Sequence, residues 1–114
     1  MKKSQVSTFL HPDFNKEGNR IKYKYTLQVT NRFKKDVQRC RKAGYDLELL
    51  RDIVIQLTTD GKLPQEYLPH PLVGEYKECM ECHIKADWLI VWKQEDNKMI
   101  IVAIATGTHN YLFE

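Results

Sequence analysis

The apolar positions in the first half of the chain change from a period of two to a period near 3.6. Apolar and polar side chains alternate over residues 21–29, which predicts a half-buried strand. Helical spacing follows from Asn31 to Gly44 and again from Asp46 to Asp60. Gly44 is a typical helix stop and Asp46 a typical N-cap. The short connection between the two patterns therefore predicts a helical hairpin.

The second half predicts a loop followed by three strands. Three prolines interrupt residues 62–74 and exclude a continuous helix or a central strand there. Strands are predicted at about 75–84, 87–94 and 98–106, and the last is apolar on both faces, which favours the centre of a sheet. The order β-α-α-β-β-β predicts an α+β fold, in which the helical hairpin packs on one face of a small, mostly antiparallel sheet.

Residues 1–20 show no periodicity and are broken by a proline and a glycine. We expect a flexible N-terminal extension, or a segment that docks weakly, ahead of a single domain at 21–114. No apolar run approaches the roughly 20 residues that span a bilayer, and no secretory signal is recognisable. The three cysteines are expected to be reduced thiols of a cytoplasmic protein without membrane association.

Charge is distributed unevenly along the chain. Residues 1–44 carry 12 Lys/Arg against 3 Asp/Glu, whereas residues 45–114 carry 6 against 12. Such asymmetry indicates a polyanionic or acidic partner, although a solvated basic helix face is an equally ordinary explanation. The candidate contacts for RNA, the ribosome or an acidic protein partner lie on the first predicted helix: Arg32, Lys34, Lys35, Arg39, Arg41 and Lys42.

Cys79, Cys82 and His83 form a C-x-x-C-H pattern, which taken alone suggests haem attachment, half a zinc site or a redox dithiol. If the segment is a strand, however, cysteines three apart point to opposite faces and cannot chelate one ion or form a tight disulfide. Cys40 is the only other cysteine, so a second ligand pair for zinc is missing. The sequence therefore predicts neither a metal nor a cofactor.

Three histidines remain as candidates for acid–base chemistry, because imidazoles titrate near neutral pH. His70 lies in the proline-rich loop, His83 on a predicted strand, and His109 just after the last strand, while Asp87 opens the strand that follows His83. We expect these four residues to meet at one end of the sheet. A purely structural role for the histidines is the alternative, and Trp88 suits the core or the stacking of an RNA base.

Five short motifs, in order and at fixed spacing, resemble the YafQ-type toxins of bacterial toxin–antitoxin modules, which belong to the RelE superfamily of mRNA interferases. The resemblance extends from about Tyr23 to Phe113. The matching motifs are F-K-K-D-V at 33–37, L-P-x-x-Y at 63–67, H-P-L-x-G at 70–74, E-C-H-I-K-A-D-W-L-I at 81–90 and T-G-T-H-x-x-L-F at 106–113.

The resemblance implies a RelE-like fold and a ribosome-dependent, metal-independent endoribonuclease that cleaves translated mRNA. It also implies a cognate DinJ- or RelB-like antitoxin that neutralises the toxin. By motif match, His70, His83, Asp87 and His109 fall on the family's acid–base residues, and Phe113 on its terminal aromatic residue. We expect Asp87 or His83 to serve as the base and His109 as the acid.

Two departures from the family pattern matter. Ala105 stands where the family carries an arginine that would stabilise charge on the scissile phosphate, so an attenuated member or a deliberately disarmed variant is implied. Lys85 and Lys77 are candidate substitutes for that charge. Ala86 replaces a proline in the turn before Asp87. A non-catalytic module that binds RNA, the ribosome or the antitoxin on the same fold is therefore the alternative function.

Overall fold

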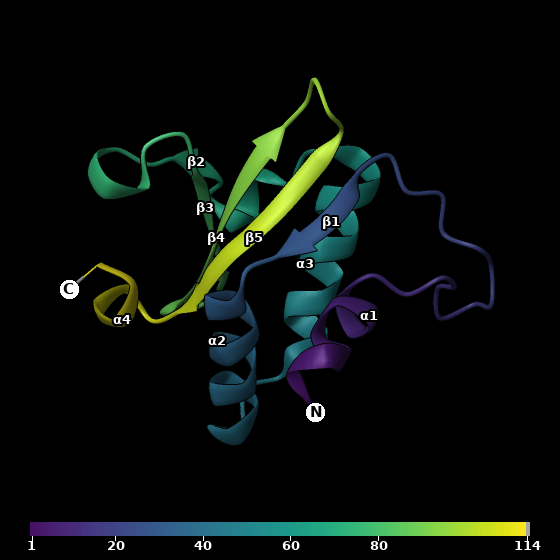
Figure 1. Ribbon diagram of the computed structural model, residues 1–114, viewed down its shortest axis with the longest axis horizontal. Helices are drawn as coiled ribbons and strands as arrows, with labels where there is room; N and C mark the ends of the chain where they lie inside the picture. Colours follow the sequence, from purple (N-terminus) through teal and green to yellow (C-terminus); the bar gives the residue numbers. More distant parts are fainter. Residues whose placement is uncertain (114) are drawn as a thin grey trace.

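The computed structural model describes residues 1–113, which form an α+β fold around one five-stranded sheet (Figure 1). The strands lie in the order β1-β5-β4-β3-β2. Their bounds are β1 Thr26–Val29, β2 His70–Pro71, β3 Met80–Lys85, β4 Trp88–Glu95 and β5 Ile100–Gly107. The helices are α1 Val6–Leu10, α2 Asn31–Lys42, α3 Leu47–Asp60 and α4 His109–Phe113, with 3-10 turns η1 Lys3–Gln5, η2 Gln65–Tyr67 and η3 Gly74–Tyr76.

The sheet is mixed but mostly antiparallel, as predicted. β5 lies between β4 and β1, and only the β1–β5 pair is parallel within the described sheet. The predicted helical hairpin is present, with Thr30 accepting from the Phe33 N–H at 3.0 Å and Asp46 from the Glu48 N–H at 3.1 Å as N-caps. Both helix predictions were therefore close in type and extent.

Two predicted strands are shorter than their sequence patterns. β1 begins at Thr26, which pairs with Ile100 at the start of β5, so the preceding residues have no strand beside them. β3 begins at Met80 because Gly74 starts a 3-10 turn and Glu78 adopts a φ of 73°, outside the extended region. The two-residue strand β2 and the terminal helix α4 were not predicted.

The sheet has an apolar layer on each face. On one face, the helices α1, α2 and α3 cover the buried residues of the larger core, among them Ile90 and Trp92 of β4. On the other face, a smaller core of Cys79, Leu89, Val91, Ala105 and Leu112 lies beneath α4 and the segment before β3. Because successive residues of β4 alternate between these layers, the functional side chains on β3–β5 can be assigned to faces from the register alone.

Of the two alternatives for the N-terminal segment, the structure shows docking, through α1. Val6 and Leu10 on α1 are fully buried in the larger core, and the Arg51 guanidinium of α3 lies 4.8 Å from the centre of the Phe9 ring. His11 stacks on Tyr23 with ring centres 3.6 Å apart. The aperiodic sequence concealed this docking because a single helical turn buries too few residues to show a period.

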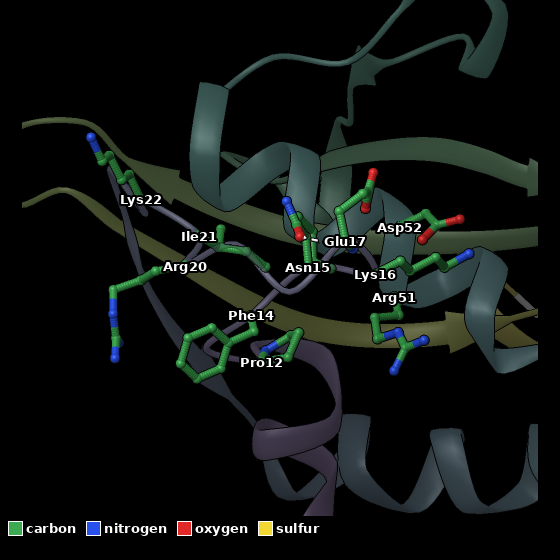
Figure 2. Close-up of a pocket in the computed structure, with 11 residues that line it drawn as sticks. Pro12, Phe14, Asn15, Lys16, Glu17, Arg20, Ile21, Lys22, Arg51 and Asp52 are labelled. Carbon is green, nitrogen blue, oxygen red and sulfur yellow. Dashed lines mark hydrogen bonds between the residues drawn. The ribbon is translucent and has the colours of Figure 1, made fainter.

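A shallow hollow of about 640 Å³ lies between the loop after α1 and the outer side of α3. Figure 2 shows Phe14 beside Pro12, with Arg20 and Lys22 directed away from Arg51 and Asp52 of α3. Figure 1 places this loop on the side of the molecule away from α4 and β2, so it is separate from the candidate residues on those two elements, His109 and His70. No helix among the described residues is long and apolar enough to cross a membrane.

Candidate active site

One row of side chains crosses four strands on the face of the smaller core. His70 of β2 pairs with Glu81 of β3, Glu81 with Val91 of β4, and Val91 with Ala105 of β5. Directly paired residues share a face of the sheet, and neighbouring strands lie about 4.8 Å apart. His70 and Glu81 are therefore adjacent, and position 105 lies about 10 Å from Glu81, on the far side of Val91.

A second row lies one pleat closer to the sheet end and brings in the other predicted residues. His83 pairs with Leu89, and Leu89 pairs with Gly107, two residues before His109. Asp87 precedes β4 at the same end, and its Oδ1 accepts the backbone N–H of His109 at 3.0 Å. The sheet thus brings His83, Asp87 and His109 to one end, with His70 on the adjacent row. Within residues 1–113, no hydrogen bond joins these four side chains directly.

The two hydrogen-bonded histidines differ in what they offer a substrate. His83 Nδ1 lies 3.3 Å from the Ala86 carbonyl, which can only accept, so the tautomer that suits this contact carries its proton on Nδ1 and offers Nε2 as an acceptor. His70 Nδ1 lies 2.7 Å from the Leu68 carbonyl, and its Nε2 lies 3.2 Å from Glu81 Oε1. Each ring nitrogen of His70 therefore faces an oxygen of the protein, one on a carbonyl and one on a carboxylate.

Helix α4 carries His109 and Phe113 over the smaller core. The Phe113 ring lies 5.0 Å from His109 and 5.5 Å from Tyr76, edge-on to the latter. The Tyr76 hydroxyl donates to the Leu112 carbonyl at 3.2 Å, and Thr108 Oγ1 accepts the Tyr111 N–H at 3.2 Å. The predicted terminal aromatic residue is thus close to a candidate catalytic histidine.

A buried carboxylate ties α4 to the sheet. Asp36 of α2 is fully buried and accepts the Tyr111 hydroxyl at 2.6 Å, the Thr106 N–H at 3.1 Å and Arg39 Nη1 at 3.0 Å. The Arg39 guanidinium lies 3.7 Å from the centre of the Tyr111 ring. Burial acts to lower the pKa of Arg39, but the hydrogen bond and charge of Asp36 outweigh it and raise that pKa.

The predicted basic contacts on α2 fall into two groups. Arg32 and Arg39 both face Asp36, and Arg32 Nη1 also donates to the Tyr76 hydroxyl at 2.6 Å. These two arginines therefore help to hold α4 in place, and their side chains are also partly exposed. The others make no ion pair within the part of the chain that the structure describes: Lys34, Lys35, Arg41 and Lys42.

Cys79 and Cys82 occupy the two different cores, as expected for opposite faces. Burial, followed by the nearby Glu81 charge, raises the pKa of the Cys82 thiol to about 12, and burial also raises the pKa of Cys79 and Cys40. All three thiols are free, and no cluster of three metal-ligating side chains occurs among residues 1–113. Within the C-x-x-C-H pattern, Cys82 and His83 lie on β3 and Cys79 directly precedes it.

The structure also describes the environments of the two positions that depart from the family pattern, Ala105 and Ala86, and of Lys85 and Trp88. Ala105 is fully buried between Leu89, Val91 and Leu112. Ala86 has a φ of 42°, which a proline, fixed near −65°, cannot adopt, so this turn follows a backbone path that excludes proline. Lys85 is exposed beside it, and Trp88 is buried toward the helices with its Nε1–H donating to Thr106 Oγ1 at 3.0 Å.

Sequence reasoning missed Glu81 and Asp36 as parts of this region. Glu81 shares the period of two with His83, and a carboxylate on an otherwise buried strand face was the available signal. Asp36 lies on the apolar stripe of its helix beside Val37, where an acidic residue needs a buried partner. Its partners are the Thr106 N–H on β5, Arg39 on the same helix and the Tyr111 hydroxyl on α4, and the sequence pattern does not predict α4.

Comparison with known proteins agrees with this geometry. A family model described as the bacterial toxin of type II toxin–antitoxin systems, YafQ, matches residues 25–114. The mRNA interferase toxin YafQ of Escherichia coli K12 is 30% identical over 88 residues, which cover 76% of this chain and 94% of that protein. Among solved structures, YafQ from E. coli BL21(DE3) has a TM-score of 0.74 at 27% identity, covering 79% of this chain and 99% of the other. The E. coli DinJ–YafQ toxin–antitoxin complex has a TM-score of 0.73 at 28% identity, covering 80% and 99%.

The five-stranded mixed sheet with its helices is the fold of the small RelE-like toxins. The chain belongs to the YafQ family, whose members are toxins of type II toxin–antitoxin systems. The predicted family and fold class are thereby confirmed. Residues 1–24, including the docked helix α1, lie outside the matched segment.

Proposed function

We propose that this protein is a ribosome-dependent endoribonuclease that cleaves translated mRNA and is neutralised by a DinJ-like antitoxin. The observation that carries the proposal is the gathering of His83, Asp87 and His109 at one end of a sheet face, with the His70–Glu81 pair on the next row. The relatives named mRNA interferase toxin and the DinJ–YafQ complex support the substrate and the partner.

The reaction follows from the roles that these groups can take without a metal ion. His83 Nε2 accepts the proton of the ribose 2′-OH, and the 2′-oxygen attacks the adjacent phosphorus. The bond from phosphorus to the 5′-oxygen breaks, and protonated His109 donates a proton to that leaving oxygen. The products are a 2′,3′-cyclic phosphate and a 5′-OH end. Asp87 holds the backbone at His109 in place.

Position 105 determines how well the developing phosphate charge is stabilised. Loss of one preorganised donor typically lowers a rate 10²–10³-fold, so an alanine there predicts a slow enzyme. We expect Ala105→Arg to raise mRNA cleavage by up to about 100-fold.

The test is cell-free translation of a reporter mRNA with mapping of the cleaved 5′ ends. The variants are the native chain, Ala105→Arg and Ala105→Met, which adds similar length without charge. Cleavage that rises only in Ala105→Arg and disappears when His109→Ala is added supports the proposal. If Ala105→Arg folds and reaches ribosomes but leaves every mRNA intact, the ribonuclease function is wrong.

A non-catalytic binding module is the second candidate, and the exposed cations of α2 without ion pairs favour it. Phosphate contacts make affinity fall steeply with salt, by a factor that depends on the number of cations engaged. Removing Lys35 and Arg41 should then flatten the salt dependence of ribosome binding. A flatter salt dependence of ribosome binding, together with no mRNA cleavage by Ala105→Arg, would support the non-catalytic binding module.

A further inference from the structure

A pocket of about 380 Å³ opens at the end of the sheet, next to the candidate active site. Its walls come from the α2–α3 connection, the β3–β4 turn and Thr108, so three separate parts of the chain enclose it. The volume falls within the range of about 300–1,000 Å³ that is common for small-molecule sites. The proton transfers proposed above do not involve this pocket, and the basic face of α2 does not line it.

The wall of the pocket is aromatic, with polar groups at its edge. Tyr45 stands edge-on to Trp88, with ring centres 4.9 Å apart, and Leu49 adds an aliphatic surface. Lys85 and the carboxylates of Asp46 and Asp87 also line it. Rings, a cation and acceptors in one pocket match the chemistry of a nucleobase, which has π faces and both donors and acceptors at its edge.

The pocket is continuous with the site because Asp87 and Thr108 belong to both. Asp87 binds the backbone N–H of His109 through Oδ1, while Trp88, the next residue, points to the helix side of the sheet. An RNA strand whose phosphate lies between His83 and His109 would therefore pass this rim on leaving the catalytic face. The pocket is the first enclosed space that it meets.

We propose that this pocket binds one nucleobase of the RNA, that of the nucleotide beside the scissile phosphate, and so contributes to sequence preference. The inference rests on the proposed ribonuclease function. Tyr45 stacks on the base, and the carboxylates at the rim accept hydrogen bonds from its amino group. Lys85 neutralises the adjoining phosphate, which gives this exposed lysine a substrate-binding role beside the active site.

A binding experiment tests the pocket without relying on cleavage. The indole N–H signals of the two tryptophans are followed by NMR while AMP, GMP, CMP or UMP is added, with inorganic phosphate as the anion control. Trp88 lines the pocket, whereas Trp92 is buried in the larger core and serves as an internal reference. At least one nucleotide should move the Trp88 signal while Trp92 stays in place.

Variants then separate stacking from general effects. Tyr45→Ala should weaken nucleotide binding about fivefold to 100-fold, the range for losing one base–aromatic stack, while Tyr45→Phe retains it. Tyr67→Ala, another partly buried tyrosine that packs on the larger core, is the matched control and should bind normally. In the mRNA assay, Tyr45→Ala should relax the preference at one position flanking the cut.

The outcomes are distinguishable from those of the proposed function. A Trp88 signal unmoved by all four nucleotides, or moved equally by phosphate, overturns the base pocket even if the enzyme cleaves mRNA. The same holds if Tyr45→Ala weakens antitoxin binding but leaves nucleotide binding and cleavage preference unchanged. If the protein binds nucleotides through Tyr45 but cleaves no mRNA, the base pocket is supported and only the proposed ribonuclease function is contradicted.

Discussion

Replacing Asp36 by alanine should both destabilise the protein and release the helix that carries His109. Asp36 is fully buried, and its carboxylate receives the Thr106 N–H, the Tyr111 hydroxyl and Arg39. In Asp36→Ala the buried Thr106 N–H has no acceptor, a loss of about 1–3 kcal/mol. The bond from Tyr111, a residue that is 44% exposed and can regain water, adds about 1 kcal/mol. Arg39 adds little because its side chain is 43% exposed and regains water.

These contributions overlap, and together they predict a loss of about 3 kcal/mol in the free energy of unfolding. For a chain of this length, that corresponds to a fall of about 10–15 °C in Tm. Thermal and urea unfolding measure the loss directly. Asp52→Ala, which removes an exposed aspartate of α3, is the control and should stay within about 0.5 kcal/mol of the native chain.

A double-mutant cycle with Tyr111→Phe isolates the link between α2 and α4. We expect a coupling energy of at least about 1 kcal/mol, together with faster amide exchange of Leu112 in each variant because α4 detaches more often. A coupling energy near zero would mean that Asp36 does not hold α4. A loss below 1 kcal/mol for Asp36→Ala would refute the buried network as a source of stability.

Three further predictions test other parts of the molecule. Burial lowers the pKa of His11, so the folded state favours the neutral form of this side chain. The free energy of unfolding should therefore fall as the pH drops below about 6.5. In unfolding measured from pH 7.5 to 5.5, His11→Phe should remove that dependence. With a pKa of about 12, Cys82 is almost entirely protonated at pH 8, so iodoacetamide should label it at the rate of global unfolding and not faster. Leu10→Ala should lower the free energy of unfolding in urea by about 2–5 kcal/mol, because Leu10 is fully buried. The control Leu68→Ala, at a residue 52% exposed, should lower it by less than about 1 kcal/mol. Equal effects would contradict the docking of α1.

The fold was predictable where the sequence is periodic. The helical hairpin and the three C-terminal strands have clear periods, and each was predicted within a few residues except at the start of β3. β2 and α4 are too short to generate a period, and their conformation depends on partners far along the chain, such as Glu81 for His70 and Asp36 for Tyr111. Local patterns do not contain that information.

For the candidate site, the sequence could nominate residue types but not their contacts. Motif order identified the three histidines and Asp87, and the register of the sheet then assigned them to two neighbouring rows. The contact between His70 and Glu81 could not be foreseen, because it depends on the irregular loop in which the Leu68 carbonyl also contacts His70. The strained turn at Ala86 likewise depends on the paired geometry of β3 and β4.

The parallel pairing of β1 with β5 has a consequence for the synthesis of the protein. Thr26 must find Ile100, and His109 reaches its place only after β5 has joined the sheet. Contacts between residues so far apart in sequence form late in folding, because long loops must close first. A nascent chain that has not passed residue 109 therefore lacks the candidate site altogether.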